Sequence, residues 1–504
     1  MGERDEIRIE GRDRVFDRRR VLFVLLLAMA MSLMAVSSVN VALPTIEEGL
    51  GASASDIQWV LSGYALAFGI TLIPAGRAGD VLGRGSWFIV GRVVFVLASL
   101  ACGLASDPLA LNAARLVQGV GAGIYSPQVT GMIQQYFSGG GRARAFSLLG
   151  FVVAASVAVG PVLSGTIIEA VGHTHGWRWT FFTYLPVGVL GIVLAALWFP
   201  FETERRLRAA GRVGRPRVDL DPVGTALMAL AVTGLMFPFM ARSAWAWLLL
   251  PLALVVLWGW VQWERRYTAA GHEPLIDLEL FRYRSFRNGI AVSGSVFLGV
   301  TSTFVVVAIF LQSGLGAGAL AAGMIGLPNA ILSGFAAIYT VRFVMEHGRR
   351  LVIIAIGVMI ASTLVSLLVA LLIESAGISF WWLAAPLAFI GLGMGALGSA
   401  NQTLSMQDIP PVHGGAASGL KQTVERIATA MGNAVITGVF FLTVGLADWV
   451  DAFVAAFAAV TVCLTLALLL AVGDARQHRL RPRPSSSPDP SPSSNPRRGR
   501  HSTF

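Results

Sequence analysis

Charged residues are scarce in this chain: Asp, Glu, Lys and Arg make up 13% of its 504 residues, whereas 55% are hydrophobic. A soluble domain carries about 25% charged residues, so the composition excludes an ordinary soluble protein. The only two cysteines, Cys102 and Cys463, lie inside apolar runs, which argues against a disulfide. The sequence shows no metal-ligand spacing, no nucleophile cluster and no Gly-x-x-x-x-Gly-Lys-Ser/Thr nucleotide loop. We therefore expect no metal, no cofactor and no enzymatic activity.

Long apolar runs occupy almost the whole chain instead. A helix needs about 20 apolar residues to cross the hydrocarbon core of a bilayer. Backbone groups in lipid must be paired within a helix or a closed barrel, and these runs lack the alternating polarity of barrel strands. The sequence predicts an all-α polytopic membrane protein with fourteen transmembrane helices, at about 21–43, 57–76, 86–105, 110–133, 145–170, 179–200, 222–240, 246–263, 288–312, 319–341, 351–373, 381–402, 417–442 and 450–472.

Lysine is nearly absent, since Lys421 is the only lysine among 38 basic residues. The arginines gather in alternate connectors, including the loops at 201–221 and 264–287 and both chain ends. Cytoplasmic connectors of membrane proteins are enriched in basic residues. We therefore predict that both termini are cytoplasmic, in a cell membrane. The net charge of +10 follows from this topology, and no nucleic-acid partner is expected.

Two long basic connectors bracket a central pair of helices, so the fourteen helices group as six, two and six. Two six-helix halves around a midplane site are typical of secondary transporters. The end of the chain is rich in Ser, Pro and Arg and has no apolar period. The predicted parts are a basic N-terminus at 1–20, a six-helix bundle at 21–200, a linker with two extra helices at 201–287, a second bundle at 288–472 and a disordered cytoplasmic tail at 473–504.

Polar side chains within the predicted membrane helices are costly in lipid, so each is a candidate for function. Asn40 either lines a central cavity or repairs a kink about one turn before Pro44. Arg115 and Gln118 lie at i and i+3 on one helix face, either as a structural pair or as functional groups. Three further residues are predicted to line a cavity, namely Tyr125, Gln312 and Asn401.

One later helix carries charges of both signs. Glu425 is the only carboxylate placed clearly within a predicted membrane helix, and it could load and release a proton. Arg426 follows it directly, and Lys421 lies at the i−4 position, where it could instead form an internal ion pair with Glu425. Both interpretations stay open from the sequence alone.

Two short glycine-containing motifs stand out. In the connector after the second helix, Gly76 and Gly79 allow close backbone approach. Asp80 can accept hydrogen bonds from a helix N-terminus, and Arg84, which follows Gly83, can pair with a carboxylate or with lipid phosphate.

In the fifth helix, Ser156, Gly160 and Ser164 recur every four residues, and Pro161 is expected to bend the helix. Gly165 completes this motif. The stripe either serves plain packing or sets which side a cavity faces.

Taken together these motifs resemble the major facilitator superfamily, and within it the fourteen-helix drug:proton antiporters, over about residues 20–475. The resemblance implies that Gly76, Asp80, Gly83 and Arg84 latch the outward-facing state. It also implies that the arginine of the Arg115-Gln118-Gly119 motif takes part in proton transfer. Gly160, Pro161 and Gly165 match the antiporter motif of helix five. Further matches to the fourteen-helix branch lie at Trp177-Arg178-Trp179 and at 274–282.

The sequence also departs from this family pattern. The branch usually has an aspartate in the first helix, where this chain has Ala35, and an asparagine where it has Tyr184. The second-half copy of the loop motif keeps little beyond Gly348-Arg349-Arg350. We therefore predict that Glu425, with Arg115 and Arg426, carries proton coupling.

The resemblance implies a secondary transporter that exports an amphipathic, cationic or neutral small molecule by alternating access, driven by protons. An uncoupled facilitator or importer is the alternative that Ala35 favours. A membrane sensor or scaffold is the alternative of another class, although the 484–504 tail is too short for a folded appendage. The expected partners are a small-molecule substrate, protons and membrane lipid, with the monomer as the working unit.

Overall fold

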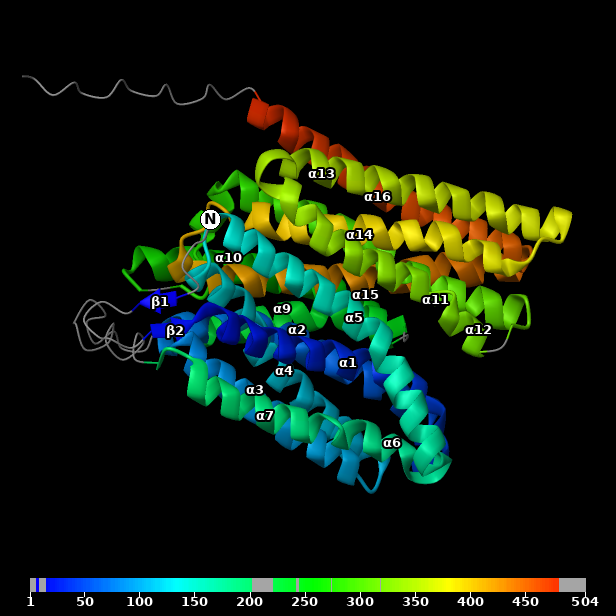
Figure 1. Cartoon of the computed structure of the whole chain (residues 1–504), viewed down its shortest axis with the longest axis horizontal. Helices are drawn as coiled ribbons and strands as arrows, with labels where there is room; N and C mark the ends of the chain where they lie inside the picture. Colours follow the sequence, from blue (N-terminus) through cyan, green and yellow to red (C-terminus); the bar gives the residue numbers. More distant parts are fainter. Residues whose placement is uncertain are drawn as a thin grey trace, which may run out of the picture.

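The computed structural model of the chain describes residues 6–8, 15–201, 221–241, 244–272, 274–317 and 319–479. Within these residues, twelve helical spans are long and apolar enough to cross a membrane. A multi-pass helical membrane protein is therefore confirmed, whereas the predicted number of fourteen spans is not. The helices lie side by side along the long axis of the molecule (Figure 1).

The elements in chain order are β1 (Glu6–Arg8), β2 (Val15–Asp17), α1 (Arg18–Leu50), α2 (Ala54–Leu82), α3 (Arg84–Leu104), α4 (Pro108–Tyr136), α5 (Gly139–Val171), α6 (His173–Phe182), α7 (Tyr184–Trp198), α9 (Pro222–Ala241), η1 (Ala244–Leu248), α10 (Leu249–Ala269), η2 (Leu278–Arg282), α11 (Arg284–Ile309), η3 (Phe310–Gly314), α12 (Ala319–Met324), α13 (Leu327–Ala376), η4 (Phe380–Leu383), α14 (Ala384–Ser405), η5 (Pro411–His413), α15 (Gly414–Leu446) and α16 (Trp449–Arg479).

Side-chain caps fix where several helices begin. At the start of α2, Ser53 and Asp56 form a reciprocal capping box. The hydrogen bonds from Ser53 hold the pKa of the Asp56 carboxyl below its ordinary value. Asp107 accepts from the backbone N–H of Ala110 at the start of α4, which has a proline at its first position. These caps satisfy amides that a helix leaves without intrahelical partners.

Two predicted spans are helical but are not among the twelve apolar spans. One is α4, which carries Arg115 and several glutamines and is buried along most of its length. Polar residues of membrane helices face the protein interior, so a helix surrounded by other helices can carry them and have this lower hydropathy. The other is the predicted span 319–341, which forms α12 and the first part of α13. The helix α13 continues through a non-helical residue, His347, into the next predicted span.

The structure corrects three further details. The basic N-terminus, for which no secondary structure was predicted, holds the antiparallel pair β1 and β2. The tail predicted to be disordered from residue 473 is helical as far as Arg479 because α16 continues that far, and residues 480–504 lie outside the described part. The predicted span 179–200 is a continuation of α6 into α7, with a break at Thr183.

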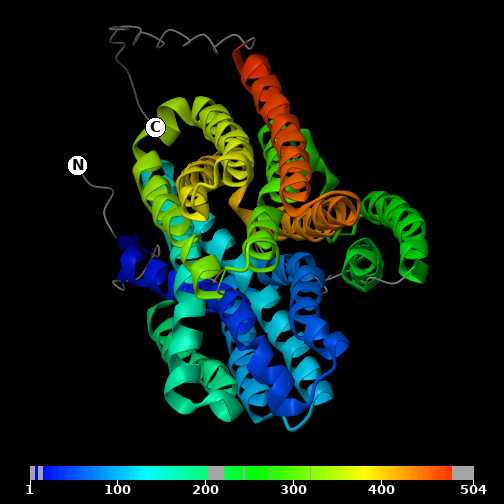
Figure 2. The ribbon, with the colours of Figure 1, turned by 90° about the vertical axis from the view of Figure 1, so that its right-hand side faces the viewer.

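Three groups of helices are visible when the molecule is viewed from its end (Figure 2). Blue to cyan helices from the first part of the chain form one group, and green to red helices from α11 onward form a second group. The helices α9 and α10 stand to one side, where α9 packs against both α2 and α15. Separate buried apolar clusters fill each group, one built from residues between 21 and 199 and one from residues between 292 and 471.

Candidate functional site

A cavity of about 1120 Å³ lies between the two main groups of helices. Its wall comes from α1, α2 and α4 on one side, α11 and α15 on the other, and α9 with η1 from the central pair. The lining stretches are 32–40 of α1, 57–68 of α2 and 426–441 of α15. The cavity therefore extends from the middle of the bundle toward the end where α1 finishes and α2 begins. This volume suits a drug-sized molecule.

Arg115 is buried at the wall of this cavity. Its Nε donates to the carbonyl oxygen of Val60 at 2.9 Å, and its Nη1 donates to the side chain of Gln118 at 2.6 Å. Nη1 also lies 3.4 Å from the carbonyl oxygen of Ala35, the position where related antiporters have an acid. The guanidinium carbon stacks 4.4 Å from the ring centre of Tyr64. Local hydrogen bonds thus hold this arginine in place within the first group of helices.

Arg426 lines the cavity from α15, on the opposite side. Its guanidinium carbon lies 4.9 Å from the ring centre of Phe68. Phe68 stacks on Tyr64 with ring centres 6.1 Å apart and planes 9° apart. The two arginines therefore rest on neighbouring aromatic rings of α2. Because cation–π contact favours a guanidinium over a ring face, these rings help to fix both charges.

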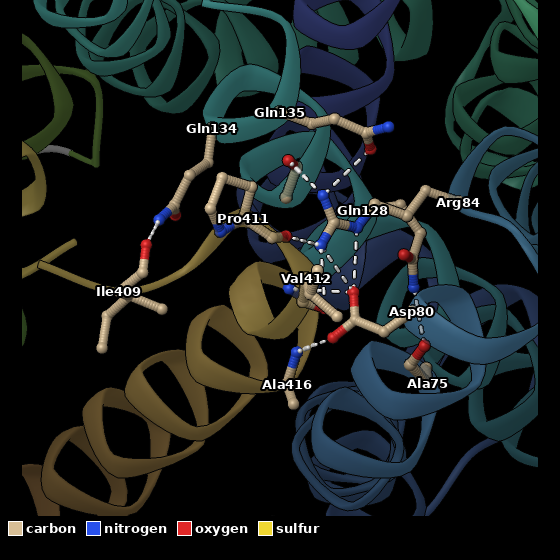
Figure 3. Close-up of polar contacts among 12 residues, drawn as sticks. Ala75, Asp80, Arg84, Gln128, Gln134, Gln135, Ile409, Pro411, Val412 and Ala416 are labelled. Atoms are coloured by element: carbon tan, nitrogen blue, oxygen red, sulfur yellow. Dashed lines mark hydrogen bonds and ion pairs between the residues drawn. The ribbon is translucent and has the colours of Figure 1, made fainter. Parts of the chain in front are cut away.

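The other end of the bundle is closed by contacts around Asp80 and Arg84 (Figure 3). The Asp80 carboxylate accepts from the backbone N–H groups of Gly415 at 3.2 Å and Ala416 at 2.9 Å, and it pairs with Arg84 at 2.8 Å. Gly415 and Ala416 lie in the first turn of α15, whose free amides and helix dipole favour a negative charge. The expected acceptance by Asp80 from a helix N-terminus is present, and the helix belongs to the other half.

Arg84 extends the same closure to α4 and to the segment before α15. Its Nη1 donates to the carbonyl oxygen of Gly131 at 2.7 Å, and its Nη2 donates to the carbonyl oxygen of Pro411. Gln134 of α4 donates to the carbonyl oxygen of Ile409 at 2.8 Å (Figure 3). It also donates to the carbonyl oxygen of Met406 at 3.0 Å. One end of the molecule is thus bridged by polar contacts between helices far apart in the chain.

Glycines allow the helices to approach closely at this end. A Cβ added to Gly76 would lie 2.4 Å from the carbonyl oxygen of Gly415, and one added to Gly419 would lie 2.5 Å from that of Leu72. Gly83 has a φ of 105°, which only glycine adopts easily, and it forms the turn from α2 to α3. The predicted close approach at Gly76 is confirmed, and α15 is its partner.

The antiporter motif of α5 packs against α1. A Cβ added to Gly160 would lie 2.1 Å from Ser37 Oγ, whereas one added to Gly165 would reach only Val41, at 3.9 Å. Ser164 is buried, and Pro161 lies inside the continuous helix α5. The glycines of this motif therefore differ in the space available for a side chain: α1 lies against Gly160 and leaves room at Gly165.

Of the five residues predicted to line a cavity, only Asn40 does so. Gln118 is fully buried and donates to Ser99 Oγ at 2.7 Å, and Tyr125 is packed between Phe88 and Phe95. Both side chains point into the first group of helices. The sequence does not fix the rotation of a helix about its axis, so this direction could not be predicted.

The remaining predicted lining residues lie in the second half, away from the main cavity. Asn401 is buried and donates to the backbone oxygen of Gly289 and to Ser293 Oγ. Gln312 is exposed in the short segment η3. Neither is among the residues that line the main cavity.

Glu425 is half-buried and does not line the cavity. Lys421 donates to Gln402 at 2.5 Å and to Ser405 at 3.1 Å, so the alternative of a Lys421–Glu425 ion pair is not formed in this structure. Among the described residues, no hydrogen bond or ion pair of the Glu425 carboxylate is found. Of the three residues predicted for proton coupling, Arg115 and Arg426 line the cavity and Glu425 does not.

Several cavity residues were not predicted from the sequence. Met236 and Phe239 of α9 and Trp247 of η1 line the cavity together with Tyr64 and Phe68. Nothing in their sequence pattern separates them from aromatic residues that face lipid. Their position follows from the packing of α9 against α2 and α15.

Comparison with known proteins gives the family. A model of the major facilitator superfamily matches residues 25–433. The chain belongs to this superfamily. It is 34% identical over 439 residues to the probable actinorhodin transporter of Streptomyces coelicolor, covering 85% of this chain and 73% of that protein. It is 30% identical over 422 residues to the cephamycin export protein CmcT of Amycolatopsis lactamdurans, covering 79% of this chain and 80% of that protein.

Solved structures share the fold. The human organic anion transporter MFSD10 superposes with a TM-score of 0.66 at 15% identity, covering 90% of this chain and 99% of that one. The proton:xylose symporter XylE superposes with a TM-score of 0.62 at 14% identity, covering 91% of this chain and 95% of that one. The match to the superfamily model over residues 25–433, with relatives whose names describe drug and antibiotic transport, confirms the predicted membership of the superfamily.

Proposed function

We propose that this major facilitator superfamily protein exports amphipathic small molecules across the cytoplasmic membrane by alternating access. The observation that carries the proposal is a cavity between two halves whose opposite end is closed by the contacts of Asp80 and Arg84. The relatives named for actinorhodin transport and cephamycin export support the same direction of transport.

The arginine-rich connectors support the orientation. The turn at Arg77 and Arg84, like the basic N-terminus, lies at the closed end of the bundle, and basic connectors mark the cytoplasmic side. In this assignment both termini are cytoplasmic and the cavity faces outward. The proposed layout has fourteen membrane helices: six at 21–200, an extra pair within 201–287 and six at 288–472. We propose the monomer as the working unit.

Transport can be tested with the full chain in liposomes that carry an internal pH dye and are exposed to a panel of lipophilic drugs. We expect substrate-dependent proton movement, which would establish antiport. Drug movement without a pH response would support the uncoupled facilitator. Ala35 favours this alternative, as does the lack of carboxylates among the described residues that line the cavity. Movement of neither drug nor proton would contradict the proposed function.

Proton coupling is assigned to Glu425, with Arg115 and Arg426 at the cavity wall. The substitution Glu425→Gln removes the titratable group and keeps the side-chain size, so we expect drug-dependent proton movement to be lost. Glu169→Gln, at an exposed position of α5, is the matched control and is expected to keep it. Full coupling in Glu425→Gln, measured with the pH dye, would show that the proton uses another group.

A further inference from the structure

The cavity wall carries positive charge without a matching negative charge. Arg115 and Arg426 both line it, and among the described residues no aspartate or glutamate does. Charges interact more strongly at a protein wall than in bulk water, because the effective dielectric constant is lower there. The sign of the lining charge therefore bears directly on which molecules can enter.

Arg426 lines the cavity without an ion-pair partner among the described residues. Among the described residues its guanidinium forms no ion pair or hydrogen bond, and its nearest aromatic partner is the Phe68 ring at 4.9 Å. Glu425 precedes it in α15 but is not within ion-pair distance and does not line the cavity. Because this guanidinium lines the cavity without an ion-pair partner, an acidic group that enters the cavity can pair with it.

Arg115 also has donors to spare. A guanidinium carries five N–H donors. The bonds to Val60, Ala35 and Gln118 use only Nε and Nη1, so none of them occupies Nη2. Since the side chain is at the cavity wall, Nη2 can serve a ligand there, and a carboxylate matches guanidinium geometry particularly well.

The rest of the lining is mostly apolar and aromatic. Phe239 and Trp247 enter from the central pair of helices, and Phe441 enters from α15. Such walls suit an aromatic or aliphatic body, while Asn40 and Asn433 provide uncharged polar contacts. The cavity therefore combines a wide apolar surface with two cationic points.

We propose that the substrates of this site are amphipathic anions, with a carboxylate or another acidic group held between Arg115 and Arg426. This inference deepens the proposed function by naming the substrate class, and it rests on transport through the same cavity. It differs from the cationic or neutral substrate predicted from the sequence, because the sequence alone does not show which charges line the cavity.

The test uses two dyes that share a xanthene ring system and differ in charge. Fluorescein carries a carboxylate and is anionic at pH 7.5, whereas rhodamine 6G is an esterified cation. Binding of each to the full chain in phosphatidylcholine nanodiscs is measured by fluorescence anisotropy. We expect fluorescein to bind at least about 10-fold more tightly than rhodamine 6G. Equal binding, or tighter binding of the cation, would overturn the proposal.

Three variants connect the preference to the cavity. Arg426→Gln is expected to weaken fluorescein binding by about 10- to 100-fold, as expected for a lost hydrogen bond to a charged group. Arg426→Lys keeps the charge and is expected to retain most of the affinity. Arg282→Gln removes one arginine from an exposed connector and is expected to change nothing. Unchanged fluorescein affinity in a folded Arg426→Gln protein would overturn the assignment.

Dye binding in nanodiscs and dye movement in liposomes are measured separately, so that the anionic substrate class and the proposed transport function can fail independently. Anion binding that depends on Arg426, without movement of either dye in liposomes, would contradict the proposed function and leave the binding site standing. Transport of rhodamine 6G but not of fluorescein would support export and overturn the anionic substrate class.

Discussion

The carboxylate of Asp80 joins α15 to Arg84 at the closed end of the molecule. It accepts from two first-turn amides of α15 and pairs with Arg84, and its side chain is 2% exposed. Hydrogen bonds to a charged group contribute about 1.5–3 kcal/mol each. The carboxylate therefore stabilises the closed end far more than a surface ion pair would.

We predict that Asp80→Asn destabilises this closure by about 2 kcal/mol, since the amide keeps an acceptor but loses the charge. The backbone amides of Gly415 and Ala416 should then exchange with deuterium about 30-fold faster. Hydrogen–deuterium exchange of the peptide that starts α15 measures this. Asp277→Asn is the control, because Asp277 caps η2 through Glu279 N–H. Unchanged exchange in α15 would contradict the role of Asp80.

At the scale of elements, the contact between α1 and α5 depends on one glycine. The Cβ of an alanine at position 160 would lie within 2.1 Å of Ser37 Oγ, while position 165 has room. The new methyl group would displace Ser37 Oγ, which donates to the carbonyl oxygen of Ser156, and it would lie 3.2 Å from the backbone nitrogen of Ser38, so the contact between α1 and α5 would be overpacked. Overpacking of this kind costs about 1–3 kcal/mol.

We predict that Gly160→Ala lowers the transport rate at least about 10-fold and that Gly165→Ala leaves it within about 2-fold of the original. The pair is matched, because both substitutions add one methyl group to the same helix. Initial rates of drug export in liposomes measure the effect. Equal rates for the two variants would show that the tight contact has no part in the transport cycle.

Sequence patterns predicted which residues form the close contacts at the closed end, but not which residues they contact. The acceptor role of Asp80 and the close approach at Gly76 follow from side-chain chemistry and size. Their partner, Gly415, lies in another half of the chain, and no local pattern identifies it. Helix rotation caused the other differences: Gln118 shares a face with Arg115 at i+3, yet it points between α3 and α4 toward Ser99 rather than into the cavity.

In the second half, the acid that pairs with the arginine of the loop motif comes from outside the motif. The degenerate loop motif of this half has no acid at the position that corresponds to Asp80. Arg349 instead pairs with Asp474 of α16 at 2.9 Å, and Asp474 also accepts from Asn288 at 2.6 Å. The acid comes from a different helix, so a search for the motif in one segment cannot find it.

On the scale of the whole molecule, α4 meets α15 deep inside the bundle. Ser126 Oγ donates to Gln422 Oε1 at 2.7 Å, between the cavity and the closed end. If the two halves rock around the cavity, this contact must separate in every transport cycle.

We predict that Ser126→Cys with Gln422→Cys, joined by a short membrane-permeant bifunctional thiol reagent, stops transport completely while dye binding in the cavity persists. The background protein replaces Cys102 and Cys463 with alanine, and each single cysteine variant is the control. Reduction of a cleavable linker should restore transport. Export at the original rate in the cross-linked protein would contradict rigid-body rocking.

The polar character of α4 bears on how the protein is made. A helix that carries Arg115, Gln118 and Gln128 gains little from entering lipid alone, because insertion of an arginine at the membrane centre is unfavourable. Its partners Val60 and Ser99 lie in α2 and α3, which are synthesised before it. We therefore expect α4 to enter the membrane against α2 and α3, which already carry these partners, rather than alone in lipid.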